Sequence, residues 1–440
     1  KHPTKLFIID NEWSITFQEL YDKVQKFSSS IEFLNKKEVI SLVSENTISF
    51  IIAYLGIINA GKIAHLIPQE ISQKNLLNQL KSADSEAIIC PQTTKENLRN
   101  YSSIKIPIVS FNEIQYKNEK LISSKINELA YLIYTSGTTS DPKGVAISHE
   151  MTEFTTKNIV NVLGYSNSDI DILPLPLHHS FGLGCFHTSL MVGSTLVLLK
   201  NANNLEHILE SVKKYSATTL AAIPATLTKF LNFDRRILEE TFSNIRLIIT
   251  NSTSIPKDTV QNFKEILKNG NLATYYGLTE ASRSTFMIFE KTIGKEESVG
   301  KPAPGIKINI FDQQKKNSEI DEIWIKGMNV IKKYWNNNEA DENIVEGWLK
   351  TGDRGFIDKD NYLFLKGRID DIINIGGEKV VPQEIEQVIK EIPGIDDVVA
   401  FGIKHEIFDQ TIKVNVVKSK DSEIDKSKIL SHCMKNLERF

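Results

Sequence analysis

The sequence predicts an α/β protein, because short apolar strands alternate with helices through the first two-thirds of its 440 residues. After about residue 300 the pattern changes to short β-like runs separated by Gly and Asn, and from residue 370 a second mixed pattern follows. We therefore expect a large N-terminal domain of covered α/β sheets with a β-rich subdomain, and then a small α+β C-terminal domain.

The first clear unit lies between residues 39 and 67. Residues 39–43 form an apolar strand pattern, 47–59 an apolar helix pattern, and 62–67 a second strand pattern closed by Pro68. A strand, helix and strand in this order predict two parallel strands that are covered on both faces.

The remaining elements are predicted by the same reasoning. Buried strands are expected at 87–89, 131–134, 218–222 and 246–249, and helices at 205–214 and 257–268. In the later part, strands are expected at 306–311, 322–325, 362–365, 372–375, 398–402 and 411–418, and a helix opened by Pro382 at 384–392.

Composition excludes several classes of protein. Lys and Arg number 52 against 55 Asp and Glu, a net charge of −3, which gives no general basic field for nucleic acid. Cys90, Cys185 and Cys433 lie far apart, which favours free thiols in a reducing cytoplasm over disulfides or zinc. The apolar stretch 48–60 is too short to span a membrane. No signal peptide is evident, and since the first residue is not Met we expect residues upstream.

The most informative segment is an apolar strand followed by a polar loop at 135–144. The loop holds five hydroxyl residues, two glycines and Lys143, a composition suited to binding polyphosphate through backbone N–H, hydroxyl and ammonium groups. It is not a Walker A loop, because Lys143 precedes Gly144. From composition alone, a flexible Ser/Thr turn is an equal alternative.

This loop resembles the phosphate-binding signature of the adenylate-forming (ANL) superfamily, which includes acyl-CoA synthetases (the AMP-dependent synthetase and ligase family), luciferases and peptide-synthetase adenylation domains. The match runs from Tyr134 to Gly144, with Ser140 replacing a glycine. The resemblance implies catalytic roles for Thr139 and Lys143 and a metal-binding role for Thr139. It implies ATP contacts by Thr135, Ser136, Gly137, Thr138, Thr139 and Lys143.

The segment 175–183 is similar to the family segment beside the carboxylate pocket, and it places His179 at the family's catalytic histidine position. By itself, a lone histidine is more often structural. Amino-acid-activating relatives carry an aspartate here, but no acidic residue lies between Leu173 and Leu196, which disfavours an α-amino acid substrate.

Residues 251–256 take the place of a Gly- and Ala-rich family loop along the adenine and the acyl pocket. Ser252 and Thr253 add volume and hydroxyl groups there, and with Ser254 they are expected at the nucleotide. The expected substrate pocket consists of His179, Phe186, Ser252 and Thr253. Taken by itself, this stretch is typical of a strand-to-helix turn with an N-cap.

A second strong match is the segment 274–280. It implies that Tyr275, Tyr276 and Gly277 lie at the adenine, Thr279 at the phosphate, and Glu280 on Mg²⁺ as a catalytic residue. Mg²⁺ is commonly held by one or two carboxylates together with phosphate oxygens and water. Without the resemblance, Glu280 would be interpreted as a helix-start residue that complements the helix dipole.

The later segments resemble ribose-binding and hinge motifs. Asp353 and Arg368 are implied to hold the ribose or phosphate, Asp370 to be the hinge, and the loop with Gly376 and Gly377 to admit a pantetheine arm. The implied division is an N-terminal adenylation domain at 1–369 and a mobile, incomplete C-terminal domain at 370–440. Relatives carry a catalytic lysine after this point in a P-x-[TS]-x-[TS/N]-G-K pattern. That pattern does not occur before Phe440, and we do not assign the role to Lys435.

The function implied is that of an AMP-forming acid–CoA ligase. It would use ATP, Mg²⁺ and coenzyme A, and would activate a fatty, short- or medium-chain or aryl acid. Transfer to a carrier-protein phosphopantetheine is the first alternative. A luciferase-like oxygenase and an inactive nucleotide-binding homologue remain as further alternatives.

Overall fold

The computed structural model describes residues 2–10, 13–114, 127–135, 142–251, 255–311, 320–337, 339–369, 371, 373–375, 378–405, 409–420 and 422–437. The chain forms two compact units. The first contains residues 1–307 and 325–349, and the second contains residues 308–324 and 350–440. Among the described residues, no helix combines the length and the hydrophobicity needed to cross a lipid bilayer.

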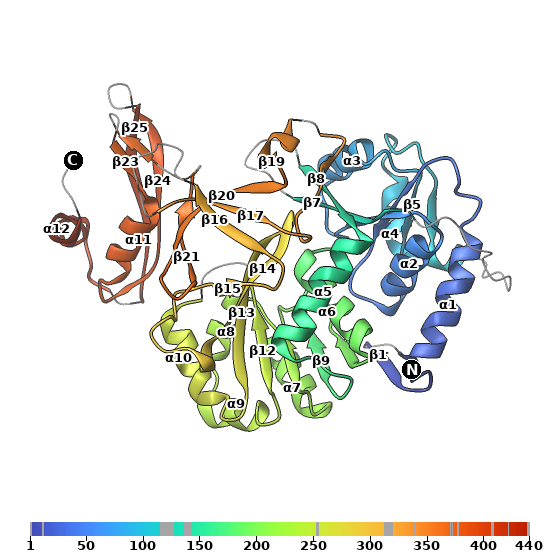
Figure 1. Cartoon of the computed structure of the whole chain (residues 1–440), viewed down its shortest axis with the longest axis horizontal. Helices are drawn as coiled ribbons and strands as arrows, with labels where there is room; N and C mark the ends of the chain where they lie inside the picture. The colour runs from blue at the N-terminus through green and yellow to red at the C-terminus, as the bar shows by residue number, and fades with distance from the viewer. Residues whose placement is uncertain are drawn as a thin grey trace. The chain divides into compact units, whose positions relative to one another are not determined.

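The first unit contains a nine-stranded sheet with a parallel centre and antiparallel edges (Figure 1). Its strand order is β15-β14-β13-β12-β11-β9-β10-β1-β2. The strands are β1 Leu6–Ile9, β2 Ser14–Thr16, β9 Ile170–Leu173, β10 Thr195–Leu198, β11 Thr219–Ala221, β12 Leu247–Thr250, β13 Asn271–Leu278, β14 Ala281–Ile288 and β15 Lys301–Pro302.

A seven-stranded sheet in the same unit has the order β18-β8-β7-β4-β3-β5-β6, and β8 pairs antiparallel with both of its neighbours, β7 and β18. The strands are β3 Val39–Val43, β4 Ile63–Ile67, β5 Ala87–Cys90, β6 Ile108–Ser110, β7 Leu129–Thr135, β8 Lys143–Ser148 and β18 Tyr334–Trp335. The expected parallel unit is confirmed, because β3 pairs in parallel with β4.

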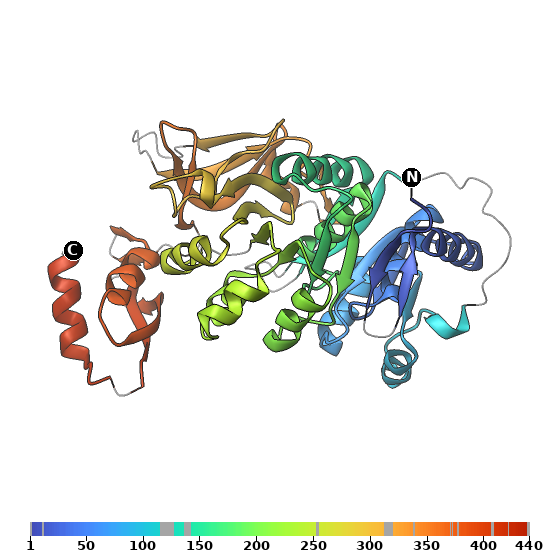
Figure 2. The same ribbon diagram turned by 90° about the horizontal axis from the view of Figure 1, so that it is seen from below.

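The helices of this unit cover the two sheets, and α5 packs against α6 (Figures 1 and 2). They are α1 Phe17–Ser30, α2 Ile48–Asn59, α3 Gln73–Ser82, α4 Gln92–Arg99, α5 His149–Leu163, α6 Ser180–Val192, α7 Leu205–Lys214, α8 Pro224–Phe230, α9 Arg235–Thr241 and α10 Lys257–Ile266, with short 3₁₀ turns at Phe111–Glu113, Phe289–Lys291 and Ala340–Asn343. The strand β12 ends at Thr250 and α10 begins at Lys257, so the expected strand-to-helix connection at residues 251–256 is confirmed. Its N-cap residue is Pro256, which makes no side-chain cap hydrogen bond.

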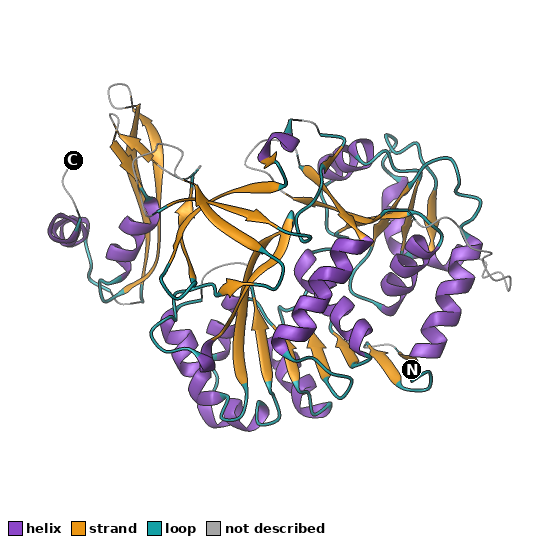
Figure 3. Cartoon of the chain, in the orientation of Figure 1, coloured by secondary structure: helices purple, strands orange, loops and turns teal. Residues whose placement is uncertain are grey.

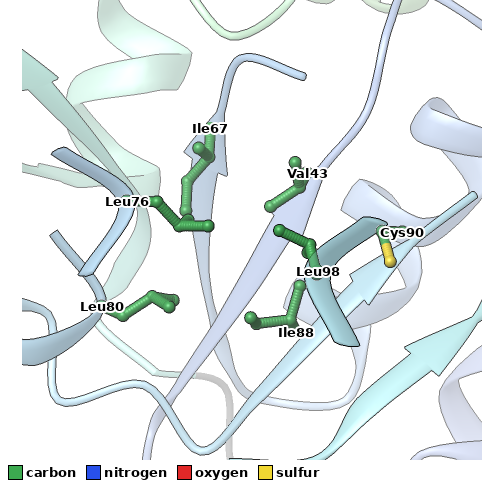
Figure 4. Close-up of a cluster of buried hydrophobic side chains, with 7 residues drawn as sticks. All are labelled: Val43, Ile67, Leu76, Leu80, Ile88, Cys90 and Leu98. Atoms are coloured by element: carbon green, nitrogen blue, oxygen red, sulfur yellow. The ribbon is translucent and has the colours of Figure 1, made fainter. Parts of the chain in front are cut away.

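Apolar side chains fill the space between the sheet and its helices. In the seven-stranded sheet, Val43, Ile67 and Ile88 meet Leu76 and Leu80 of α3 and Leu98 of α4 (Figure 4). Helix α2 is buried along most of its length, and the Thr47 hydroxyl caps it by accepting a hydrogen bond from the N–H of Phe50. The burial explains why α2 is apolar without being a membrane span.

The second unit is richer in strands (Figure 3). One sheet has the order β16-β17-β20-β19 with β21 beside β20, and the boundaries between the units fall within or beside these strands. A four-stranded sheet has the order β23-β22-β25-β24. The elements of these two sheets and their helices are β16 Lys307–Phe311, β17 Asp321–Lys326, β19 Ile344–Val345, β20 Trp348–Ile357, β21 Leu363–Arg368, β22 Ile373–Ile375, β23 Glu378–Val380, α11 Pro382–Lys390, β24 Ile395–His405, β25 Asp409–Lys418 and α12 Lys426–Asn436. Of these, β19 lies in the first unit, and β16, β17 and β20 each cross a unit boundary.

The expected division at residue 370 falls on a residue outside the described part of the chain. The chain passes between the two compact units three times, because residues 308–324 belong to the second unit and residues 325–349 to the first. The limits of the units therefore differ from a single division at residue 370. The hinge at Asp370 and the division into domains at 1–369 and 370–440 stay predictions.

Candidate functional site

The expected phosphate loop leaves the end of an antiparallel hairpin. Thr135 is the last residue of β7 and pairs with Lys143, the first residue of β8. The sheet therefore holds the hydroxyl residue and the ammonium residue at the two ends of the loop, and the phosphate-binding role of both stays a prediction. Ser136, Gly137, Thr138 and Thr139 lie outside the described residues.

The second signature forms another hairpin, between β13 and β14. Leu278 pairs with Ala281, so Thr279 and Glu280 form the turn between the strands. The interpretation of Glu280 as a helix-start residue is wrong, because no helix begins there in the described chain. A tight turn after a paired strand fixes the backbone of the two residues expected at phosphate and metal.

Gly277 is required by the close approach of the two strands in this hairpin. A Cβ atom at this position would lie 2.6 Å from the Ala281 carbonyl oxygen and 2.6 Å from the Arg283 nitrogen. Both neighbours are backbone atoms and cannot rotate away. The predicted adenine-site glycine therefore has a clear structural reason, which is independent of any ligand.

Tyr334 connects the two signature hairpins. Its strand β18 pairs with β8, Tyr334 opposite Val145, and its phenol donates a 3.1 Å hydrogen bond to Glu280 Oε1. Burial and the adjacent Glu280 carboxylate raise the pKa of Tyr334 well above its ordinary value, so the phenol remains a donor. The Ile331 N–H also donates to the Glu280 carbonyl, at 2.9 Å. Residues 331–334 thus position Glu280 beside the hairpin that carries Lys143.

The segment with the two histidines precedes helix α6. The rings of His178 and His179 lie 4.4 Å apart between centroids, and His179 is the N-cap of α6 without a side-chain cap bond. Burial lowers the pKa of His178 to about 3, and burial also lowers the pKa of His179. Both imidazoles are therefore neutral at pH 7, so His179 can accept or donate a hydrogen bond without adding charge.

Asn46, which follows β3, fixes this segment. Its amide nitrogen donates to the carbonyl oxygens of Leu175 at 2.8 Å and Leu199 at 3.1 Å, and its oxygen accepts from the Leu177 N–H at 2.8 Å. These hydrogen bonds join the carboxyl end of a strand in one sheet to the carboxyl ends of two strands in the other. Ligands bind at this edge in open α/β folds.

Two predicted site residues are buried among aromatic rings. Phe186 packs near Phe7, Tyr54 and His187, at centroid distances of 6.2, 6.3 and 5.6 Å, as a core residue does. Tyr275 meets the ring of Phe181 edge-on at 5.3 Å. Tyr276 is also buried. The roles of Phe186 in the acid pocket and of both tyrosines at the adenine stay predictions.

In the second unit, the predicted ribose residues form an ion pair. Arg368 Nη1 lies 2.9 Å from Asp353 Oδ1, and the two residues are register partners in β20 and β21. The Asp353 side chain is 13% exposed and the Arg368 side chain 38% exposed. Gly352 has a φ of 71°, and a Cβ there would lie 2.9 Å from Arg368 Nη2. The pair orients the Asp353 carboxylate, while the ribose role of both residues stays a prediction.

The remaining predicted residues lie outside the described part of the chain. They are Ser252, Thr253, Ser254, Asp370, Gly376 and Gly377. Within the described residues, no group of three or more His, Cys, Asp or Glu side chains is arranged to hold a metal ion. A single carboxylate at Glu280 still fits Mg²⁺, since this ion takes much of its coordination from phosphate and water.

A family model described as AMP-binding enzyme matches residues 1–335. The chain belongs to this family.

Three relatives of this AMP-binding enzyme match almost its full length. The oxalate–CoA ligase of Arabidopsis thaliana is 29% identical, over 98% of this chain and 89% of its own. The long-chain-fatty-acid–CoA ligase of Haemophilus influenzae is 26% identical, over 99% and 87%. The o-succinylbenzoate CoA synthetase of Bacillus subtilis, solved with its acyl-adenylate intermediate, has a TM-score of 0.88 and 25% identity, over 99% and 90%.

These matches confirm the expected adenylate-forming superfamily, the α/β fold and the enzyme class, an AMP-forming acid–thiol ligase of the acyl-CoA synthetase type. Two residues that position the predicted site residues were not predicted from the sequence: Asn46 and Tyr334.

Proposed function

We propose that this AMP-binding enzyme activates a carboxylic acid with ATP and transfers the acyl group to the thiol of coenzyme A. The observation that carries the proposal is the Tyr334–Glu280 hydrogen bond, which brings the two signature hairpins to one place. The names of the relatives support a CoA ligase, but they differ in the acid.

In the first step, a carboxylate oxygen of the acid attacks the α-phosphorus of ATP. A C–O–P linkage forms, the bond to pyrophosphate breaks, and pyrophosphate leaves. Lys143 and the loop that begins at Thr135 would neutralise the phosphates, and neutral His179 would orient the acid. Most of the catalysis would come from position and charge complementarity.

Glu280 would hold Mg²⁺ together with the hydroxyl of Thr139, and the ion would neutralise phosphate charge when bound. Tyr334 orients the Glu280 carboxylate, and Asp353 would accept hydrogen bonds from the ribose hydroxyl groups. In the second step, the thiol sulfur attacks the acyl carbonyl, AMP leaves with the former carboxylate oxygen, and the thiol proton passes to solvent.

The acid class follows in part from the site. Neutral histidines and the absence of an acidic side chain at 173–196 favour an acid without an ammonium group. A reducing, cytoplasmic location is part of the same proposal, and it is supported by three cysteines that are all free.

The test is exchange of labelled pyrophosphate into ATP with a panel of carboxylic acids, followed by thioester formation with coenzyme A. Acid-dependent exchange and AMP as the nucleotide product are expected. ADP as the sole product, or ATP binding without exchange for every acid, would contradict the proposal. Transfer only to a carrier-protein phosphopantetheine would correct the thiol acceptor.

A further inference from the structure

Arg283 adopts a backbone conformation that arginine rarely takes. It lies in β14, yet its φ is 57°, in the left-handed region. Tyr276 pairs with Thr285 and Leu278 pairs with Ala281, so Gly277 alone faces the three residues 282–284. In a strand, successive side chains point to opposite faces of the sheet, and a bulge interrupts this alternation and re-aims a side chain. Bulges are frequent beside active sites. A residue other than glycine adopts this region only at a steric cost, because its Cβ lies too close to the following carbonyl oxygen.

The bulge places the guanidinium group against the first turn of α6. Arg283 Nη2 donates to the carbonyl oxygens of Ser180 at 3.0 Å and Phe181 at 3.2 Å. The guanidinium carbon lies 4.9 Å from the centre of the Tyr275 ring. A Cβ at Gly184 would lie 2.1 Å from Nη2, so the guanidinium occupies the space that a side chain there would fill.

No carboxylate of the described residues neutralises this cation. Arg283 is 4% exposed and forms no ion pair within the described chain, and its Nε–H has no hydrogen-bond partner there. Nη1 donates to the Ser282 hydroxyl at 2.5 Å, which adds no negative charge. A buried cation without a counter-ion is costly, and so is an unpaired buried donor.

The helix beside the guanidinium adds a second attraction for an anion. Helix α6 has 13 residues, and its N-cap His179 supplies no side-chain acceptor to the first-turn N–H groups. The N-terminal end of a helix carries a partial positive charge and favours anions. The guanidinium group contacts Ser180 and Phe181, which directly follow His179, the residue that we expect beside the acid.

We propose that Arg283 is a specificity residue that recognises a second anionic group on the acid, so that the substrate is a dicarboxylic acid. This inference rests on the proposed function and narrows its substrate class. One carboxylate would react with ATP, and the other would pair with the guanidinium group through the Nε–H that the fold leaves open. The arginine fork suits a carboxylate.

The test compares diacids of two to eight carbons with the monoamides of the same length in pyrophosphate exchange. A monoamide keeps the shape of the diacid and lacks only the second charge. In the unchanged protein, kcat/KM for the best diacid should exceed that of its monoamide by roughly ten-fold or more, the scale of a charge-assisted pair. Arg283→Gln should reduce this preference to within about three-fold, and Arg283→Lys should keep part of it.

The matched control is Arg236→Gln on the exposed side of α9, which should leave the preference unchanged. If Arg283→Gln does not fold, the comparison in the unchanged protein decides alone. Equal or better exchange with monoamides overturns the inference while the proposed function stands. Exchange with no acid at all overturns the proposed function, and this inference with it.

Discussion

The phenol of Tyr334 donates a 3.1 Å hydrogen bond to the carboxylate of Glu280, although 54 residues separate them in the sequence. Tyr334 belongs to a two-residue strand at the edge of the seven-stranded sheet, and Glu280 belongs to the turn between β13 and β14 of the nine-stranded sheet. One side chain therefore sets the orientation of the carboxylate that we expect at the metal.

Tyr334→Phe removes this donor and keeps the ring. A hydrogen bond to a charged group contributes about 1.5–3 kcal/mol, so we expect pyrophosphate exchange to fall roughly ten- to hundred-fold. A titration of exchange against Mg²⁺ should shift to higher concentration. The control is Tyr21→Phe, at an exposed tyrosine of α1. An unchanged Mg²⁺ dependence would show that Tyr334 does not act through the metal site.

Gly277→Ala tests the close approach of β13 and β14. The added methyl group would meet two backbone atoms at 2.6 Å, so the hairpin must open. We expect a lower melting temperature, by several degrees, and a loss of exchange of roughly a hundred-fold. Gly193→Ala is the comparison for activity, because Gly193 has open space around it; its φ of 77° should cost stability while exchange is kept. A Gly277→Ala protein as active as the Gly193→Ala protein would refute the steric requirement.

Asp353→Asn tests the predicted ribose contact. In the unchanged protein, ATP should be preferred over 2′,3′-dideoxy-ATP by roughly ten-fold or more, because a carboxylate accepts from hydroxyl groups strongly. The variant should lose most of that preference in kcat/KM for exchange. Its stability should change little, since the partner Arg368 is 38% exposed. Asp360→Asn, in an exposed turn, serves as control. Retained discrimination would place the ribose elsewhere.

Buried histidines predict sensitivity to acid. Burial lowers the pKa of His65 to about 3, while an unfolded histidine has a pKa of about 6.5. Below pH 6.5 the unfolded chain thus binds a proton that the folded chain does not. The free energy of unfolding then falls as pH falls, by up to about 1.4 kcal/mol per pH unit for each such histidine.

Between pH 6.5 and pH 5, His65→Gln should reduce the dependence of the unfolding free energy on pH. The reduction should correspond to about one proton fewer taken up on unfolding. The measurement is chemical unfolding at a series of pH values. His207→Gln is the control, because that side chain is 40% exposed. An equal slope in both variants would mean that His65 takes up its proton in the folded protein.

Local patterns predicted the elements well. The strand Val39–Val43 and the helix Leu205–Lys214 have the expected limits, because an apolar run and a 3.6-residue period are carried by neighbouring residues. Glu280 was predicted as a site residue, but its place in a hairpin turn was not predicted. The hairpin depends on the pairing of β13 with β14, which the motif itself does not indicate.

Contacts between distant segments were not visible in the sequence. Tyr334 reaches Glu280 only because β18 pairs with β8, and the left-handed φ of Arg283 depends on the register across a bulge. Neither the residue types nor their spacing in the sequence indicates which residues of two distant strands are paired. A buried cation beside the signature can be recognised only when its surroundings are known.

The three hydrogen bonds of Asn46 couple the segment expected beside the acid to the sheet that carries the expected phosphate loop. Its side chain holds Leu175, Leu177 and Leu199 at the end of a strand whose own sheet carries the hairpin of Lys143. A disturbance at this one amide would reach the histidine segment and the nucleotide hairpin together. A substitution that changes acid specificity by breaking the Asn46 hydrogen bonds should therefore also weaken ATP binding. Substitutions that change the acid alone would have to lie elsewhere in the pocket.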